Sequence, residues 1–396
     1  MSASTAGETQ SLTNVFAEGP HVSETRQPER PSFEEVKEEL ADQTLTIPNL
    51  RLLFEHWPQG VNPALESLEH AILGGVEKFG MKPEHRESLV EANVAHFAAQ
   101  CWPEADLDIL KFSAHLVMWT WGIEGYTDTL VAGQETANNF RSEAKSVWSS
   151  MLELSGLNGA RNDSREPALQ YRTLIASFKP LAARCCQMFD PESRQLLLDE
   201  LFVYLKGTEL EANMRSSRQM PSHDRYLHMR TLANGSGFFL VLSGLYKLAG
   251  NQAVVGRSPP WVELKKTAAT INFLVNDLVS AKREFKTGEY LNSILLRAHD
   301  LHSVDASAAE CIIRIKSLVQ EFDHQAQAIL ADATQTDKAR TAAVGAIRAM
   351  RSFNVGSLEW RLKTANGDRA ASLNVKRYGL RDHTMLDGTI RLKLGQ

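Results

Sequence analysis

From Ile47 to about residue 363, apolar residues recur every three or four positions, which is the spacing of α-helices that bury one face. One such stretch begins near Pro63, in the first helical turn where proline is tolerated, and its apolar residues are Leu65, Leu68, Ala71 and Ile72. Alternating patterns typical of β-strands are scarce, and the glycine-rich phosphate loops G-x-G-x-x-G and G-x-x-x-x-G-K are absent. The sequence therefore predicts an all-α fold.

Proline and glycine divide this region into successive helices, and the breaks include Pro180, Pro191, Pro221 and Pro259-Pro260. The stretch from Leu107 to Trp119 is apolar on most sides, as expected of a buried helix. Further helices are expected at 135–156, 167–188, 191–215, 223–249, 261–285, 306–332 and 336–363.

The first 45 residues have a different composition. They are rich in Ser, Thr, Glu, Pro and Gln and contain few large apolar side chains, which predicts disorder. Residues 1–19 lack the apolar core of a secretory signal. No repeat with a period of 20 to 50 residues is present. We expect a disordered leader over residues 1–45 and one helical domain over residues 46–396.

Charge and cysteine usage narrow the range of partners and compartments. The chain is 43% hydrophobic and 23% charged, with a net charge of −5, so no nucleic-acid partner is expected. No apolar run approaches the roughly 20 residues of a membrane-spanning helix, and stable membrane insertion is not expected. Four cysteines without a C-x-x-C pair suit a reducing, cytoplasmic location: Cys101, Cys185, Cys186 and Cys311.

Three oxygen-bearing residues share one face of a predicted helix. Asn276, Ser280 and Glu284 are at positions i, i+4 and i+8, which places them within about 80° of one another over roughly 12 Å of helix. Amide, hydroxyl and carboxylate oxygens are hard ligands of the kind that Mg²⁺ prefers. Arg283 precedes the last of them, where a guanidinium is able to pair with a phosphate oxygen. The alternative is a solvated helix end with assorted polar residues.

The segment N-D-L-V-S-A-K-R-E, from Asn276 to Glu284, is similar to the second metal motif of microbial class I terpene synthases, and the style of the Trp57-Pro58 segment resembles fungal members. The resemblance implies a single-domain helical bundle around a central active-site cavity. It implies that Asn276, Ser280 and Glu284 bind one of three Mg²⁺ ions, with Mn²⁺ as a substitute, which together hold the substrate diphosphate. It also implies that Arg283 contacts diphosphate.

The same family has a diphosphate-sensing arginine about 45 residues before this motif, and Arg230 lies 46 residues before Asn276. Two glycines follow in Asn234-Gly235-Ser236-Gly237, each costing about 1 kcal/mol relative to alanine within a helix, so we expect the helix to break there. In the family this break helps to trigger ionisation. Its usual glycine, four residues after the sensor, is Asn234 here, and Gly235 follows. Arg230, Asn234 and Gly235 are therefore the predicted catalytic residues, although Arg230 has the plainer alternative of an ordinary helix cation.

The first metal motif of the family, D-D-x-x-D, is altered in this chain. Glu124 and Asp128 occupy its first and last positions, on one helical face, but Gly125 replaces the second acid. The resemblance implies that Glu124 and Asp128 bind the remaining Mg²⁺ ions. A Glu and an Asp at this spacing also occur by chance on many helices.

Arg377-Tyr378 resembles the pair that holds diphosphate near the C-terminus of many family members, although the gap that separates it from Trp360 is longer than expected. A cavity for a carbocation also needs aromatic walls, which stabilise the cation by about 0.5–2 kcal/mol per ring. Each candidate ring has core packing as its alternative role: Trp119, Phe238, Phe239, Phe273 and Trp360.

We therefore expect a terpene cyclase, a lyase that acts on an isoprenyl diphosphate. Farnesyl diphosphate is the expected substrate and a sesquiterpene hydrocarbon or alcohol the product, with ten- and twenty-carbon diphosphates as alternatives. A chain-elongating prenyltransferase would normally carry two Asp-rich motifs, which this chain lacks. A catalytically impaired relic or interaction protein is a further alternative, favoured by Gly125. A monomer or a homodimer is expected.

Overall fold

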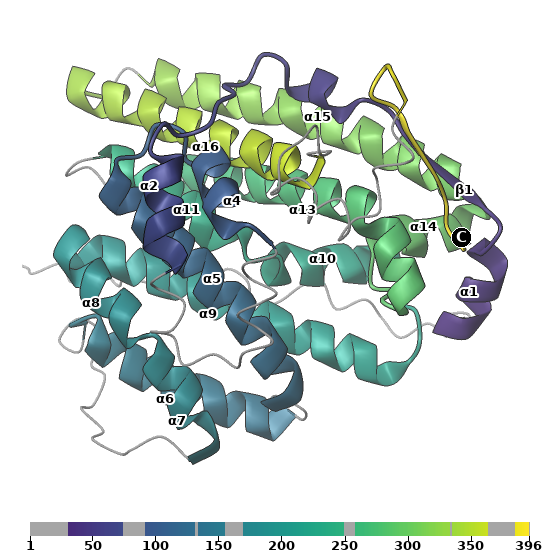
Figure 1. Cartoon of the computed structure of the whole chain (residues 1–396), viewed down its shortest axis with the longest axis horizontal. Coiled ribbons are helices and arrows are strands. Elements are labelled where there is room, and N and C mark those ends of the chain that lie inside the picture. Colours follow the sequence, from purple (N-terminus) through teal and green to yellow (C-terminus); the bar gives the residue numbers. More distant parts are fainter. Residues whose placement is uncertain are drawn as a thin grey trace, which may run out of the picture.

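A computed structural model describes residues 31–73, 92–130, 134–154, 169–248, 258–332, 335–362 and 385–395. The described part is a bundle of helices (Figure 1). The α-helices are α1 (Phe33–Leu40), α2 (Leu65–Leu73), α4 (Val94–Cys101), α5 (Leu107–Leu130), α6 (Gln134–Met151), α7 (Leu169–Ser177), α8 (Lys179–Met188), α9 (Pro191–Ser217), α10 (His223–Ala233), α11 (Ser236–Leu248), α13 (Pro259–Thr287), α14 (Ser293–Leu301), α15 (Val304–Ala331) and α16 (Asp337–Leu362).

The predicted all-α fold is confirmed, and so are most of the predicted breaks. Helices α9 and α13 begin at Pro191 and Pro259, where the missing N–H of proline costs no helical hydrogen bond. The region 167–188, expected as one helical stretch, is two helices in its described part, α7 and α8, divided at Phe178. Pro180 lies in the first turn of α8, because a proline inside a continuous helix would clash with the preceding turn.

Helix α13 runs through the middle of the bundle. It packs against α10, α11, α14, α15 and α16 (Figure 1). Between Thr267 and Lys282 nearly every side chain is buried, including polar ones such as Asn272 and Asp277. A helix buried on all sides is in contact with several neighbouring helices and not with water. Its polar side chains must therefore form hydrogen bonds within the protein.

Helices α9 and α10 approach each other closely at Gly207. A Cβ atom at this position would collide with the backbone of Ala233, the last residue of α10. Glycine is therefore required on α9, and the contact fixes the end of α10 against a long helix. This end is the helix break that the sequence predicts.

The ordered region begins earlier than expected, which corrects part of the predicted leader. Residues 1–30 lie outside the described part, but Phe33–Leu40 form α1 and Thr44–Ile47 form strand β1. Strand β1 pairs antiparallel with β2 (Ile390–Lys393), close to the C-terminal end of the chain (Figure 1). Local composition misses this pairing because the partner strand lies at the opposite end of the sequence.

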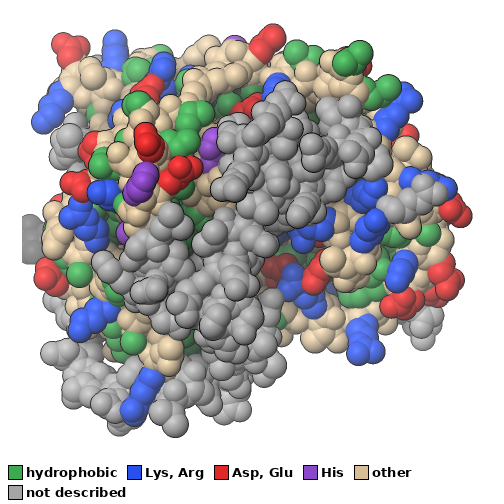
Figure 2. Space-filling model, in the orientation of Figure 1, with side chains coloured by type: hydrophobic (Ala, Val, Ile, Leu, Met, Phe, Trp, Pro, Cys, Tyr) green, Lys and Arg blue, Asp and Glu red, His purple; other side chains and the backbone are tan. Residues whose placement is uncertain are grey.

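A short 3-10 helix, Leu50–Phe54, connects β1 to the rest of the bundle. Basic and acidic side chains are interspersed over the described part of the face in Figure 2. Within the described ranges, no helix combines the length and the hydropathy that a membrane span requires.

Candidate active site

The three predicted metal ligands on α13 face the interior of the protein. Ser280 is fully buried, and the Glu284 side chain is only 13% exposed. The Ser280 hydroxyl oxygen is buried and has no hydrogen-bond partner in the described part of the chain. Such an orphaned oxygen is uncommon in a folded protein and calls for an explanation. A divalent cation that shares Asn276, Ser280 and Glu284 as ligands provides one, and the donor set fits Mg²⁺.

Arg230 crosses from α10 to this stripe. Its Nη2 atom donates a hydrogen bond to Asn276 Oδ1 at 3.0 Å, and its Nε atom lies 3.4 Å from Asp277 Oδ1. Burial lowers the pKa of Arg230, but Tyr226, Asp277, Glu211 and Glu284 together raise it by more, so the guanidinium keeps its charge. The structure thus brings the predicted sensor and the predicted metal motif into direct contact.

Asp277 joins three helices beneath the site. Its Oδ2 atom accepts hydrogen bonds from the Tyr226 hydroxyl at 2.6 Å and from the Ser293 N–H at 3.0 Å. Burial raises the pKa of Asp277 to about 6, against the lowering effect of Arg230. The carboxyl group connects α10, α13 and the start of α14, and it holds Arg230 at its place beside Asn276.

Glu284 has two hydrogen-bond donors. Arg283 Nη2 donates to Oε1 at 2.8 Å, and Asn292 Nδ2 donates to Oε2 at 2.8 Å. Arg283 is 33% exposed, whereas Asn292 is fully buried. The sequence predicted Arg283 at this site but not Asn292, because Asn292 follows the end of α13 and reaches Glu284 only through the fold.

The predicted break between α10 and α11 is present. Gly235 has a φ of +69°, a conformation that favours glycine, and a Cβ atom at this position would lie 3.4 Å from the ring of Tyr204. Asn234 Oδ1 accepts from the Ser236 N–H at 3.2 Å, and Asn234 Nδ2 donates to the Ala269 carbonyl on α13 at 3.1 Å. The side chain of Asn234 therefore ties the break to the helix that carries the metal motif.

The other predicted ligands fall partly or wholly outside the described residues. Positions 124 and 128 lie on α5, but their side chains are not described. Arg377 and Tyr378 lie outside the described ranges altogether. All four residues remain predictions.

Two of the predicted pocket-lining rings have several aromatic neighbours in the core. The ring centroid of Trp119 is 5.4 Å from that of Trp148 and 5.0 Å from that of Phe178, and its Nε1 atom donates to Ser177 Oγ at 2.8 Å. The Phe239 ring lies between Trp102 and Phe353 at centroid distances of 6.0 and 5.9 Å. Both rings have ample aromatic partners of their own.

A second tryptophan of α5, Trp121, lies on a different face of the helix from Trp119. At about 100° per residue, position 119 is about 140° and 180° around the helix from positions 124 and 128, whereas position 121 is within about 60° of both. Trp121, Phe97 and Trp360 form a triangle with centroid distances between 5.2 and 5.4 Å. Trp360 is among the rings predicted from the sequence and Trp121 is not, because α5 is apolar on most sides and gives no directional pattern.

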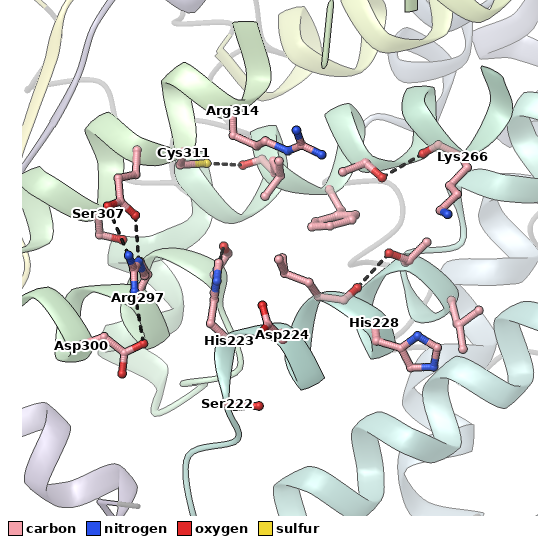
Figure 3. Close-up of a pocket in the computed structure, with 18 residues that line it drawn as sticks. Ser222, His223, Asp224, His228, Lys266, Arg297, Asp300, Ser307, Cys311 and Arg314 are labelled. Carbon is pink, nitrogen blue, oxygen red and sulfur yellow. Dashed lines mark hydrogen bonds and ion pairs between the residues drawn. The ribbon is translucent and has the colours of Figure 1, made fainter. Parts of the chain in front are cut away.

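The remaining two candidate rings line other spaces. Phe238 borders an apolar void of about 30 Å³ between α5, α8, α9 and α11. Phe273 borders a cavity of about 730 Å³ between α10, α13, α14 and α15. Figure 3 shows charged side chains around this larger cavity, together with the imidazole of His228: Asp224, Lys266, Arg297, Asp300 and Arg314.

The 730 Å³ cavity lies beside a different face of α10 from the one that contacts the metal motif. Leu227 and Thr231 line it, and they are about 100° around the helix from Tyr226 and Arg230. One polar contact connects the two sides: His223 Nε2, at the cavity, is 2.9 Å from Ser293 Oγ, and the Ser293 N–H binds Asp277.

Comparison with known proteins agrees with this geometry. The family described as "Terpene synthase family 2, C-terminal metal binding" matches residues 115–322, a range that contains α10 and the whole of the α13 motif. The chain belongs to this family of terpene synthases, whose description implies that it binds a divalent metal.

Individual relatives are similar over most of their length. The sesquiterpene cyclase hepA of Aspergillus oryzae is 23% identical over 357 residues, which cover 88% of this chain and 92% of the relative. Pristinol synthase of Streptomyces pristinaespiralis is 23% identical over 341 residues, which cover 83% of this chain and 87% of that protein.

Solved structures share the fold. A hedycaryol synthase in complex with HEPES has a TM-score of 0.62 at 19% identity, covering 77% of this chain and 95% of that one. A variant of cucumene synthase has a TM-score of 0.62 at 18% identity, covering 77% of this chain and 97% of that one. The chain therefore has the α-helical fold of class I terpene synthases.

Proposed function

We propose that this terpene synthase is a Mg²⁺-dependent sesquiterpene cyclase that ionises farnesyl diphosphate and cyclises the resulting carbocation. The observation that carries the proposal is the contact between Arg230 and Asn276, at 3.0 Å, on a buried stripe that also holds Ser280 and Glu284. A cation-binding set and a buried guanidinium side by side are suited to a diphosphate, which needs both metal ions and hydrogen-bond donors.

In this proposal Asn276, Ser280 and Glu284 hold one Mg²⁺ ion, and Glu124 and Asp128 hold the others. Bound there, the ions supply Lewis-acid stabilisation of the departing diphosphate. Arg230 and Arg283 donate hydrogen bonds to its oxygens, and Arg377 and Tyr378 add donors from the C-terminal region.

The C–O bond breaks with its electron pair on diphosphate. The allylic cation then cyclises, and it either loses a proton to give a hydrocarbon or adds water and then loses a proton to give an alcohol.

The helix break has a role in starting this reaction. Arg230 pairs with Asp277 and lies in the last turn of α10, four residues before Asn234. When the guanidinium shifts toward diphosphate, the end of α10 moves with it. Asn234 transmits this shift to Ala269 on α13 through its 3.1 Å hydrogen bond. We assign to Arg230 the sensing of diphosphate and to Asn234-Gly235 the response.

The cation must be kept from water until it has cyclised. Trp121 and Trp360 are the rings that we assign to the wall beside the metal motif of α5, supported by Phe97. Their faces stabilise a cation by about 0.5–2 kcal/mol each. The relative named sesquiterpene cyclase supports a fifteen-carbon substrate.

The test is an incubation of purified protein with geranyl, farnesyl and geranylgeranyl diphosphate, each with Mg²⁺ and with chelator, followed by mass spectrometry of extracted products. We expect a sesquiterpene from farnesyl diphosphate only when Mg²⁺ is present. Turnover of only the ten- or twenty-carbon substrate would correct the substrate. Absence of turnover with every substrate and metal would favour the catalytically impaired relic, the alternative that Gly125 supports.

A further inference from the structure

Asn292 uses every hydrogen-bonding position of its side chain. Its Nδ2 atom donates to the Asp277 carbonyl at 2.7 Å and to Glu284 Oε2 at 2.8 Å. Its Oδ1 atom accepts from the N–H groups of Ile294 at 2.8 Å and Leu295 at 3.4 Å. Two donors and two lone pairs are the full capacity of an asparagine amide.

These partners fix the direction in which the amide points. Turning it over would set Nδ2 against the two N–H groups at the start of α14 and Oδ1 against the oxygens of Asp277 and Glu284. Asn292 is also fully buried, so water offers it no substitute partner. The N–H that points at Glu284 is therefore fixed by the fold.

Glu284 needs such a partner because of its position. It lies in the last turn of α13, where the helix carbonyls disfavour a negative charge. Its second donor, Arg283, is one-third exposed and has a charge suited to diphosphate, so that arginine is not a permanent anchor. Asn292 occupies one position of Oε2 and leaves the second lone pair of that oxygen for a cation.

We propose that Asn292 is a positioning residue of the metal site: its amide N–H orients the Glu284 carboxylate for the cation. The inference rests on the proposed function in one respect, the role of Glu284 as a ligand. Hydrogen-bonded partners of metal ligands set ligand orientation, and their loss typically weakens metal affinity by about 10- to 100-fold.

The same side chain also connects the site to α14. Because Oδ1 caps the first turn of α14, the distance from that helix to Glu284 is fixed by one rigid amide. The neighbouring Ser293 N–H, bound to Asp277 at 3.0 Å, adds a second connection. Helix α14 thereby stabilises the position of the metal motif, although none of the predicted ligands lies on it.

The test separates the donor from the cap. Asn292→Asp keeps the shape and the capping oxygen but replaces the donor with an oxygen beside Glu284. Asn292→Ser removes the donor without adding charge. Binding of Mg²⁺ together with inorganic diphosphate is measured by calorimetry and by the rise in melting temperature, and circular dichroism checks the fold. We expect both variants to bind Mg²⁺ at least about 10-fold more weakly.

Turnover provides a second readout that a purely structural role would not change. If Asn292 acts through Glu284, the Mg²⁺ concentration at half-maximal rate rises, and kcat recovers at saturating Mg²⁺. The matched control is Asn49→Asp. Asn49 also caps a helix with Oδ1, toward the Arg51 N–H, and donates from Nδ2 to a backbone carbonyl, that of Asp387, and neither partner is a predicted metal ligand. Its Mg²⁺ affinity should equal that of the wild type.

Folded Asn292→Asp and Asn292→Ser proteins with wild-type Mg²⁺ affinity would overturn the inference. Loss of folding in both variants would also overturn it, because Asn292 would then serve the fold alone. If the wild-type protein itself shows no Mg²⁺-dependent binding of diphosphate, the proposed function fails instead.

Discussion

Arg230 donates a hydrogen bond to Asn276 Oδ1 at 3.0 Å, across the contact between α10 and α13. The two residues are 46 positions apart in the sequence and belong to different predicted motifs, one for diphosphate and one for metal. Asp277 stabilises this contact, because its carboxyl group pairs with Arg230 and accepts a hydrogen bond from the Tyr226 hydroxyl. In the proposed function, sensing of diphosphate and binding of metal share this one set of side chains.

Replacement of Arg230 by lysine should lower turnover far more than it lowers stability. Lysine keeps a positive charge near Asp277, but it lacks the fixed fork that reaches both Asn276 and a diphosphate oxygen. We expect kcat to fall by about 10²-fold or more, as for the loss of one preorganised donor. Arg225→Lys, on the exposed start of α10, is the control. Equal activity of the two variants would remove Arg230 from the reaction.

Replacement of Ser280 by alanine should leave the free energy of unfolding nearly unchanged in the absence of metal. Its buried hydroxyl has no partner in the described part of the chain, so its removal breaks no hydrogen bond there. Mg²⁺ binding should weaken at the same time. Ser243→Ala provides the contrast, because Ser243 accepts from Trp102 Nε1 at 2.9 Å and should lose about 1–3 kcal/mol. Denaturant unfolding and Mg²⁺ titration measure the two effects.

Protonation of His223 should destabilise the fold at mildly acidic pH. Burial and the nearby Arg297 lower the pKa of His223 below its usual 6.5, although Asp224, Asp300 and Glu310 oppose the shift. Because the unfolded chain then binds the proton more tightly, the contribution is fully present above pH 6.5 and is lost as the pH falls toward the lower folded pKa.

The difference in unfolding free energy between wild type and His223→Asn measures this effect. Its value should change between about pH 7 and pH 5 and be constant at higher pH. A pH-independent difference would show that His223 has the same proton affinity in both states.

Two neighbouring tryptophans on α5 should respond differently to the same substitution. Trp119→Phe removes a hydrogen bond to Ser177 and should cost about 1–3 kcal/mol with an unchanged product pattern. Trp121→Phe should alter the ratio of products with a smaller loss of stability, because we assign Trp121 to the wall of the cavity. Gas chromatography and thermal unfolding of both variants give the comparison. An altered product ratio for Trp119→Phe alone would reverse the assignment.

Much of the fold and the core of the site follow from local sequence. Helical spacing and proline positions predict α9 and α13, and the i, i+4, i+8 pattern predicts the stripe of Asn276, Ser280 and Glu284. Helix propensity predicts the break at Gly235, since glycine adopts its positive φ without strain. In each case the deciding interactions lie within a few residues along the chain.

What the sequence analysis missed depends on contacts between distant segments. Asn292 reaches Glu284 because the chain turns back after α13, and strand β1 is ordered because β2 pairs with it. The sequence pattern does not distinguish the surroundings of Trp119 from those of Trp121. In the fold, Trp119 packs against Trp148, whereas Trp121 packs against Trp360. Glu124, Asp128, Arg377 and Tyr378 remain predictions.

The central claim is that oxygens of Asn276, Ser280 and Glu284 bind one divalent cation beside Arg230. Crystals soaked with Mn²⁺ and inorganic diphosphate, with anomalous scattering recorded for manganese, test it most directly. The account predicts an anomalous peak at bonding distance, roughly 2.0–2.3 Å, from all three oxygens, with a diphosphate oxygen next to the Arg230 guanidinium. Bound diphosphate with manganese peaks only elsewhere would contradict it.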